Sequence, residues 1–389
     1  MIVKQKTPYL SLGTPAVLVD LETLEANISE MSRLAAEANI RLRPHIKVHE
    51  NVSIANMQIE AGACGVEVGA VEQAEAIAEQ GIEDIIIAHP SYYGNSKGKI
   101  LKKLISRPAL TLTLVIDMLE QAEIISQIAQ EMGKQIPLLI KIDLGKSSRF
   151  GVLPGEPVLT LARNLLRFPG IALSGIYGHE MGAKPTEEDK DTVAFEAATL
   201  MTENTEMLRK EHINVKHVSL GASSTFRSTC RFIKEGKFPE ITEIHPGQCV
   251  IGDIMYMRAG GNTRKACAVT VLATVITTSH PDWAIIDAGY KTFGADSLIS
   301  HQDSADFFWN GMPSFGSVQN RPDIWFGRMS AETSQLYYKD INKKLNFGER
   351  LEIVPNNATL VINIHNQIYG VRDGNVEKVI KVTGRGRGN

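Results

Sequence analysis

Short apolar runs alternate with longer amphipathic stretches from Thr14 to about Tyr256, and this alternation constrains the fold most. The run Ala16–Leu21 predicts a buried strand, and the stretch after it repeats apolar residues at helical spacing. Further runs of the same kind are IRLRPHIK, GVEVGA, DIIIAHP, LTLVID, PLLIKIDLG, GIYGHE and HVSLGA. Nearly continuous apolar strands between helices indicate a parallel sheet covered by helices. About eight such units over about 240 residues match an α/β fold, the (β/α)8 TIM-type barrel.

The composition of the chain changes after about Arg258. The segments CAVTVLATVITT, WAIIDAG, ERLEIVPNN, TLVINIHNQIYGV and KVIKVTG are rich in Val, Ile and Thr, which is typical of antiparallel strands. We therefore expect a barrel over residues 14–256. We expect residues 257–389 to form a mainly antiparallel C-terminal β domain, to which residues 1–13 also belong. A doubly wound open sheet is the competing architecture. The lack of a G-x-G-x-x-G turn after the first strand argues against a dinucleotide-binding version of it.

Composition restricts the partners. The 41 Lys and Arg nearly balance the 44 Asp and Glu, and a net charge of −3 gives no electrostatic signature for nucleic acid or an anionic membrane. No apolar stretch is long enough to span a bilayer, and the N-terminus lacks the apolar region of a signal peptide. The four cysteines lie far apart, which favours free thiols in a reducing, cytoplasmic setting over disulfides.

Lys47 is the first candidate for chemistry. It follows Pro44 in RLRPHIKVHE, so it would lie at or just beyond the end of a strand. The carboxyl ends of barrel strands are where active sites lie. A desolvated lysine there, flanked by His45 and His49, has a lowered pKa and forms Schiff bases or transfers protons. A solvated surface lysine is the alternative.

Two small turns predict a phosphate site. The string SLGASSTFR (Ser219–Arg227) places small residues and hydroxyls directly after a predicted strand, and HPGQC (His245–Cys249) is a second small turn with exposed amides. Backbone amides and hydroxyls at such turns bind phosphate, and phosphate sites in these barrels commonly use the last two loops. Each turn alone is a weak signal, because Gly/Ser loops are common.

Three further side chains follow predicted strands. Arg149 lies between two glycines in DLGKSSRFG, where a guanidinium can orient an anion or form an ordinary surface ion pair. Tyr177 and His179 in GIYGHE are two residues apart, so on a strand they share a face and can point into one site. A core tyrosine and a structural histidine are the alternative.

The sequence resembles the D-threonine aldolase and D-serine dehydratase family, which belongs to the alanine-racemase-like enzymes that bind pyridoxal 5′-phosphate (PLP). The opening TPAVLVDLETLEANI followed by RPHIKVHE carries the specific part of the resemblance. It continues through AGACGVEVGAVEQAE, KIDLGKSSRFGV, GIYGH, TEIHPGQCV, IIDAGYK and PNN with Asn363 downstream. VRDG and the closing GRGRG complete it, so the likeness runs nearly end to end.

The resemblance implies a PLP-binding barrel and a β domain that works as a homodimer, with each β domain completing the partner's site. It implies that Lys47 forms the Schiff base with the cofactor. It assigns cofactor binding to Lys47, Arg149, Tyr177, Gly221, Ser223, Ser224, Thr225, Gly247 and Gln248. Which of the Ser223, Ser224 and Thr225 hydroxyls binds the phosphate stays open.

The chain departs from the family at the metal site. Metal-dependent members carry P-N-H-x-C or P-N-H-x-D, whereas this chain reads PNNAT, with Asn357 and Thr359 at the ligand positions. An amide and a hydroxyl are poor ligands for zinc or manganese, so we expect no divalent cation of the family type. His365, on the same predicted strand, is a possible substitute ligand, but we expect it to be a structural histidine.

The activity expected first is a PLP-dependent lyase that acts on a small β-hydroxy D-amino acid, by Cα–Cβ cleavage as in an aldolase or by dehydration. Without a metal, a protein group must assist, and His179, His89 or a residue of the partner's β domain are candidates; His179 is the one we assign as catalytic. An amino-acid racemase or epimerase comes second, and a non-catalytic PLP-binding protein third. A metal-dependent hydrolase is disfavoured by the lack of a His/Asp ligand cluster.

Overall fold

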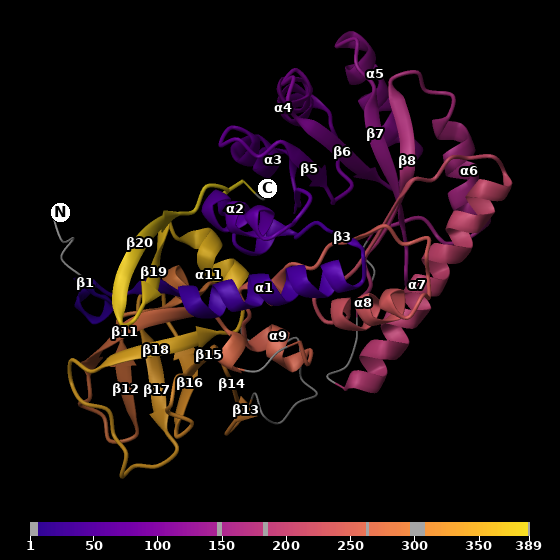
Figure 1. Cartoon of the computed structure of the whole chain (residues 1–389). Coiled ribbons are helices and arrows are strands. Elements are labelled where there is room, and N and C mark those ends of the chain that lie inside the picture. Colours follow the sequence, from indigo (N-terminus) through magenta and orange to yellow (C-terminus); the bar gives the residue numbers. More distant parts are fainter. Residues whose placement is uncertain (1–6, 146–149, 182–185, 262–263, 296–307, 388–389) are drawn as a thin grey trace, which may run out of the picture.

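The structure is a computed structural model that describes residues 7–145, 150–181, 186–261, 264–295 and 308–387. It has two parts, seen in Figure 1 as a helix-covered parallel sheet above an antiparallel sheet. Among the described residues, no helix combines the length and the apolar character that a membrane span needs.

The first part is a barrel of eight parallel strands in the order β3-β10-β9-β8-β7-β6-β5-β4. A parallel bridge between His45 and Glu67 joins the two ends of this order. The strands are β3 (Arg41–Leu42), β4 (Val66–Val68), β5 (Asp84–Ile87), β6 (Thr111–Ile116), β7 (Ile136–Ile142), β8 (Ile171–Gly178), β9 (His217–Leu220) and β10 (Glu243–Ile244). The predicted (β/α)8-type architecture is confirmed.

Helices cover the outside of this barrel. They are α1 (Leu21–Glu37), α2 (Val52–Glu60), α3 (Val71–Ala78), α4 (Asn95–Ile105), α5 (Leu119–Glu131), α6 (Glu156–Leu165), α7 (Glu187–Lys210) and α8 (Phe226–Lys234). In α1, for example, Asp20 accepts a hydrogen bond from the Thr23 amide (2.7 Å) as N-cap, and Leu24, Ile28 and Met31 form the buried stripe. Helix α1 packs against β3, α2 and α8, so it belongs to the helical ring of the barrel.

The second part is a ten-stranded, mainly antiparallel sheet, as predicted. Its strands are β1 (Thr7–Pro8), β2 (Ala16–Asp20), β11 (Val269–Thr277), β12 (Trp283–Ile286), β15 (Gly316–Val318), β16 (Ile324–Met329), β17 (Ser334–Tyr338), β18 (Arg350–Pro355), β19 (Gln367–Arg372) and β20 (Asn375–Lys381). A separate hairpin joins β13 (Phe308–Trp309) to β14 (Met312–Pro313). Helix α9 (Ile254–Arg258) lies between β10 of the barrel and β11, whereas α10 (Tyr290–Phe293) and α11 (Ala358–Ile364) lie within the second part.

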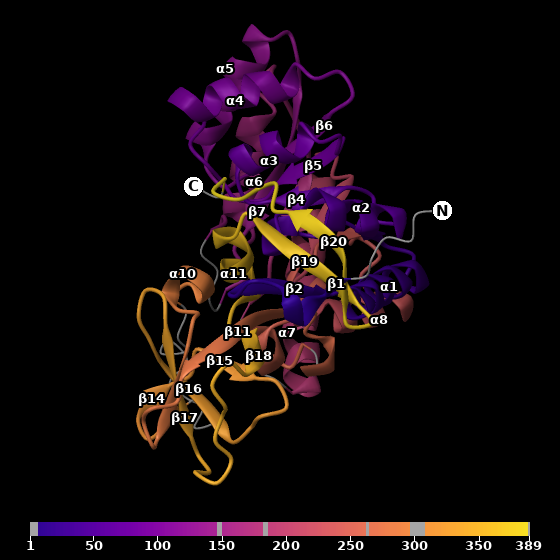
Figure 2. The ribbon, with the colours of Figure 1, turned by 90° about the vertical axis from the view of Figure 1, so that its left-hand side faces the viewer.

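The placement of Ala16–Leu21 as the first barrel strand is wrong. Strand β2 lies in the second sheet, antiparallel to β11 and parallel to β19 (Figure 2). Its pairs include Val19 with Val269 and Leu18 with Tyr369. The eighth barrel strand is instead β10, which is two residues long and was not predicted. Strand β1 pairs with β20, so the chain from residue 7 returns to the second sheet, as expected for the N-terminal segment.

Candidate active site

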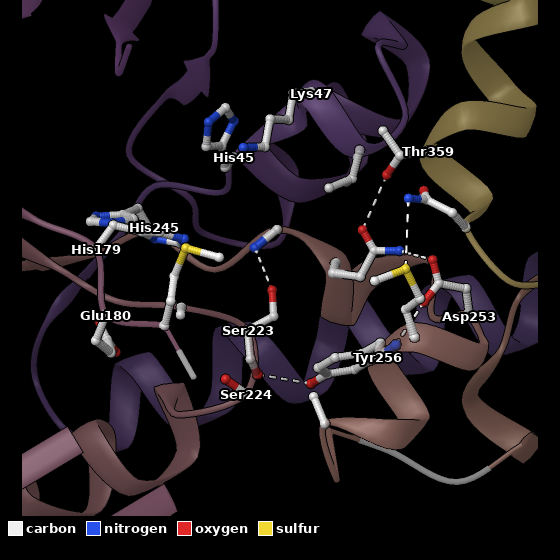
Figure 3. Close-up of a pocket in the computed structure, with 18 of the residues that line it drawn as sticks. His45, Lys47, His179, Glu180, Ser223, Ser224, His245, Asp253, Tyr256 and Thr359 are labelled. Carbon is white, nitrogen blue, oxygen red and sulfur yellow. Dashed lines mark hydrogen bonds between the residues drawn. The ribbon is translucent and has the colours of Figure 1, made fainter. Parts of the chain in front are cut away.

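Lys47 lies beyond the end of β3, in a short 3-10 helix, Ile46–Val48. Pro44 accepts the Glu67 amide (2.9 Å) and the His45 amide donates to Pro246 (3.1 Å), so the chain is held between β4 and the turn after β10. Lys47 is half-buried and lines a cavity of about 660 Å3 at the carboxyl ends of the strands (Figure 3). Its nitrogen lies beside the ring of His45 in that view.

Two turns form the wall of the cavity opposite Lys47. They are Ala222–Ser224 after β9 and Gly247–Gln248 after β10, here called the cradle. The Gly247 amide donates to Ser223 Oγ (3.0 Å), and the Tyr256 hydroxyl donates to the Ser223 carbonyl (3.0 Å). A Cβ on Gly247 would lie 2.6 Å from the His45 carbonyl oxygen, so only glycine allows this close approach. Hydroxyls and amides at such turns are suited to an anion.

Three histidines line the cavity near Lys47: His45, His179 and His245. Burial lowers the pKa of His179 to about 3 and lowers the pKa values of His45 and His245 well below the ordinary histidine value. The charge of Lys47 acts in the same direction on His45 and His179. All three rings are therefore neutral at physiological pH, and each can accept a proton through one nitrogen.

The tautomer of His179 follows from its partner. His179 Nδ1 lies 2.7 Å from the Gly221 carbonyl oxygen, which can only accept a hydrogen bond. Nδ1 is therefore the protonated nitrogen, and Nε2 carries the lone pair. His179 thus has an acceptor nitrogen in the same cavity as Lys47.

A buried polar layer lies beneath the cavity, inside the barrel. Tyr177 stacks on His245 at 4.3 Å between ring centroids and donates to Glu67 Oε2 (3.1 Å). Lys141 Nζ lies 4.8 Å from the centre of the Tyr177 ring. Burial raises the pKa of Glu67 to about 8 and lowers the pKa of Lys141 to about 8. Both groups titrate near neutral pH, which is unusual for either residue type.

The second part of the chain supplies the remaining wall. Thr359 in α11 donates to Gln248 Oε1 (3.1 Å), and Gln248 Nε2 donates to Asp253. Asp253 also caps α9 by accepting the Tyr256 amide (2.8 Å). Asn357 Oδ1 accepts the Leu360 amide (3.3 Å) as N-cap of α11. Hydrogen bonds between the two parts of the chain thus hold this wall of the cavity in place.

The cavity brings together most of the residues singled out from the sequence. Lys47, His179, Ser223, Ser224, Gly247 and Gln248 line it. Tyr177, Gly221 and Thr225 do not: Tyr177 lies beneath His245, the Gly221 carbonyl faces His179, and buried Thr225 donates to Glu180. Arg149 lies outside the described residues. The chemical roles of these residues stay proposals.

Other lining residues were not predicted. His245 was passed over within HPGQC, where only the amides were considered, because the short strand before it is not an apolar run. Asp253 and Tyr256 could have been found from the N-cap pattern DIMY. Glu180, Met255 and Arg258 carry no comparable signal and reach the site through tertiary packing.

Comparison with known proteins identifies the family. The model "Alanine racemase, N-terminal domain" matches residues 19–254. The chain belongs to this family. The model "Putative serine dehydratase domain" matches residues 268–371, so the second part of the chain is also related to a described family.

Relatives of this family member match along nearly the whole chain. The 3-hydroxy-D-aspartate aldolase of Paracoccus denitrificans (strain Pd 1222) is 26% identical over 97% of this chain and 93% of its own length. The D-threo-3-hydroxyaspartate dehydratase of Delftia sp. (strain HT23) is 28% identical over 90% and 91%. The crystal structure of D-threonine aldolase from Filomicrobium marinum superposes with a TM-score of 0.85 at 26% identity, covering 98% of both chains.

The family implies PLP, and the cavity fits this cofactor chemically. Lys47 supplies an amine for the aldehyde, and the cradle supplies amides and hydroxyls for the phosphate. Within the described residues, both ring nitrogens of His45 and Nε2 of His245 are buried without a hydrogen-bond partner. Unsatisfied buried polar atoms are rare, and here they line the cavity that would receive a polar ring.

Proposed function

We propose that this protein is a PLP-dependent lyase that cleaves a β-hydroxy D-amino acid, in the manner of a D-threonine aldolase. The observation that carries this proposal is the placement of Lys47 and the cradle in one cavity. The whole-chain likeness to aldolases and a dehydratase of such substrates supports the lyase over other activities.

The residues that line the cavity have separate roles in this reaction. PLP withdraws electrons from Cα of a bound amino acid, which weakens the bonds to that carbon. Lys47 holds the aldehyde of the cofactor, and Ser223, Ser224 and the amides of Gly247 and Gln248 hold its phosphate. His179 Nε2 takes the proton of the substrate β-hydroxyl, and the loss of this proton allows the Cα–Cβ bond to break.

The experiment that tests the activity supplies the purified enzyme with D-threonine, D-serine and D-alanine. Aldehyde, keto acid and enantiomer are measured together. We expect glycine and acetaldehyde from D-threonine. Keto acid alone would make the enzyme a dehydratase, inversion of alanine alone would make it a racemase, and no product from a PLP-loaded sample would indicate a non-catalytic PLP-binding protein.

A second experiment tests the lysine. Borohydride should fix PLP irreversibly to the wild-type chain, and peptide mapping should find it on Lys47. The Lys47→Ala variant should show no fixation. A matched control is Lys141→Met, which removes a neighbouring buried amine that does not line the cavity. Fixation that survives Lys47→Ala but disappears in Lys141→Met would assign the amine to Lys141 instead.

We further propose that the enzyme works without the divalent cation of its metal-dependent relatives. The side chains at the ligand positions have other partners: Asn357 caps α11 and Thr359 binds Gln248. His365, the possible substitute, places Nδ1 2.7 Å from the Val361 carbonyl and does not line the cavity. Over the parts of the chain that the structure describes, no three His, Cys, Asp or Glu side chains form a metal-type cluster.

We also propose that the protein is a homodimer that works in the reducing cytosol. The four cysteines are free thiols in the structure. Exposed apolar side chains follow the carboxyl ends of β5 to β8 and so surround the mouth of the barrel: Tyr92, Met118, Phe150, Leu153 and Met181. Exposed apolar patches of this kind mark protein interfaces. Sedimentation should show a dimer that Leu153→Glu weakens and that Phe347→Glu, in the loop between β17 and β18, leaves intact.

A further inference from the structure

His245 combines burial with an unused nitrogen. It follows β10, is 1% exposed and lines the cavity. Its Nε2 has no hydrogen-bond partner among the described residues. Its ring is held flat against Tyr177, at an angle of 10° between the planes. The nitrogen is therefore fixed in position, buried in the wall of the cavity, and without a partner among the described residues.

A hydrogen-bonded chain behind the ring fixes its tautomer. Ser219 Oγ lies 2.8 Å from His245 Nδ1 and 3.2 Å from Glu243 Oε1. Burial opposes ionisation of Glu243, but His217 and Arg43 together hold its pKa far below the ordinary value, so the carboxylate is charged and only accepts hydrogen bonds.

A serine hydroxyl has one proton to donate. If Ser219 donated this proton to His245 Nδ1, the Ser219 and Glu243 oxygens would face each other with lone pairs only and could form no hydrogen bond. The proton therefore goes to Glu243, and His245 Nδ1 donates to Ser219. This leaves Nε2 of a neutral imidazole as an acceptor without a partner in the wall of the cavity.

We infer that His245 Nε2 is the acceptor that binds the protonated nitrogen of the PLP pyridine ring, positioned by Ser219 and Glu243. The inference rests on the proposed function, since it takes PLP as the occupant. The aldehyde and the phosphate arm of PLP are on neighbouring ring carbons, and the nitrogen lies across the ring from the aldehyde. Lys47 and the cradle would hold the first two groups, so the ring nitrogen would lie on the side away from Lys47.

The charges around the three histidines agree with this placement. Lys47 is among the main groups that act on the pKa of His45 and of His179, whereas the main groups acting on His245 are His179, Glu243, Lys141 and His217. Figure 3 shows His245 beside His179, while Lys47 lies beside His45. An acceptor there favours the protonated ring, which withdraws electrons more strongly than the neutral ring.

The first test needs neither cofactor nor activity. The cofactor-free protein is labelled with ¹⁵N-histidine, and the His245 signals are assigned by their absence in His245→Leu. We expect a protonated Nδ1 and a pyridine-type Nε2. In Ser219→Ala, we expect the Nε2-protonated form to become populated. A protonated Nε2 in the wild type, or an unchanged spectrum in Ser219→Ala, would overturn the inference.

The second test compares affinities for PLP and for its carbocyclic analogue, in which C–H replaces the ring nitrogen. The wild type should bind PLP roughly ten- to hundredfold more tightly than the analogue. His245→Leu should bind the two equally, and His212→Asn, at an exposed position whose φ of 59° suits asparagine, should discriminate as the wild type does. Wild-type discrimination in His245→Leu would overturn the inference.

Circular dichroism would establish that His245→Leu is folded. If it is not, the wild-type ¹⁵N spectrum and the PLP discrimination of Ser219→Ala, expected to be weaker than in the wild type, still decide the matter. A wild type that fails to bind PLP at all would instead contradict the proposed function, while the tautomer measurement would stand by itself.

Discussion

The hydroxyl of Tyr177 donates to Glu67 Oε2 at 3.1 Å and so connects β8 to β4 across the interior of the barrel. Both side chains are completely buried, and burial raises the pKa of Glu67 to about 8. A protonated carboxyl can still accept this hydrogen bond, so the connection does not require a charge on Glu67.

The stability of the protein should depend on pH through Glu67. Between pH 4.5, the ordinary pKa, and about 8, Glu67 is protonated in the folded chain and ionised in the unfolded chain. Folding then binds a proton, so the free energy of unfolding falls as pH rises, by up to about 1.4 kcal/mol per pH unit. Glu67→Gln keeps an acceptor for Tyr177 and removes this fall, which urea unfolding at several pH values would show. The control variant Glu332→Gln, at an exposed position, should keep the wild-type slope of unfolding free energy against pH between pH 5 and 8. If Glu67→Gln kept that slope as well, the pH dependence would not come from Glu67.

His179→Asn should reduce kcat by about 10²- to 10⁴-fold, the usual contribution of a general base. The asparagine amide can still donate to the Gly221 carbonyl, so the local structure and the absorption spectrum of bound PLP should persist. His212→Asn is a matched control, because His212 is exposed and its φ of 59° suits asparagine. Undiminished turnover in His179→Asn would exclude His179 as the base.

Two substitutions distinguish the hydroxyl of Ser223, in the cradle, from that of Thr225, which lies outside it. Ser223→Ala should weaken PLP binding about tenfold, because Ser223 lines the cavity and accepts the Gly247 amide. Thr225→Val should instead lower stability by about 1–3 kcal/mol, because it leaves the buried carboxyl of Glu180 without its donor. Equilibrium titration and urea unfolding separate these outcomes, and the reverse pattern would assign the phosphate to Thr225.

Chelation should not inactivate the wild-type enzyme. Treatment with EDTA and readdition of manganese or zinc, followed by assay with D-threonine, checks this. The double variant N357H/T359C restores the family pattern and should bind zinc or manganese measurably, at a cost of about 1 kcal/mol from the lost N-cap of α11. Wild-type activity that is lost with EDTA and restored by the metal would contradict the metal-free proposal.

The barrel strands could be predicted where they are long and apolar, as in β6 and β7, because burial on both faces gives a continuous run. Strand β10 has two residues, one of them Glu243, and gives no such run. Strand β2 was found, but its place was not, because its partner Val269 in β11 is distant in sequence and periodicity does not reveal pairing partners.

The segment TLVINIHNQIYGV was predicted as one strand, but it forms helix α11 followed by β19. Asn357 starts the helix, and Ala358, Val361 and Ile362 are its buried residues, a helical spacing that the β-branched composition obscured. Thr359, which the sequence singled out only as a former metal-ligand position, lines the cavity from this helix. His245 was missed because its role depends on Ser219 and Glu243, which come from neighbouring strands.

The pairing of β1 with β20 joins Thr7 to Val376. Strand β1 therefore leaves the ribosome long before β20 is synthesised. It stays without its pairing partner during most of the synthesis of the chain. Contacts so distant in sequence slow folding. We therefore expect a permuted gene that encodes β1 and β2 directly after β20 to give a chain that folds faster.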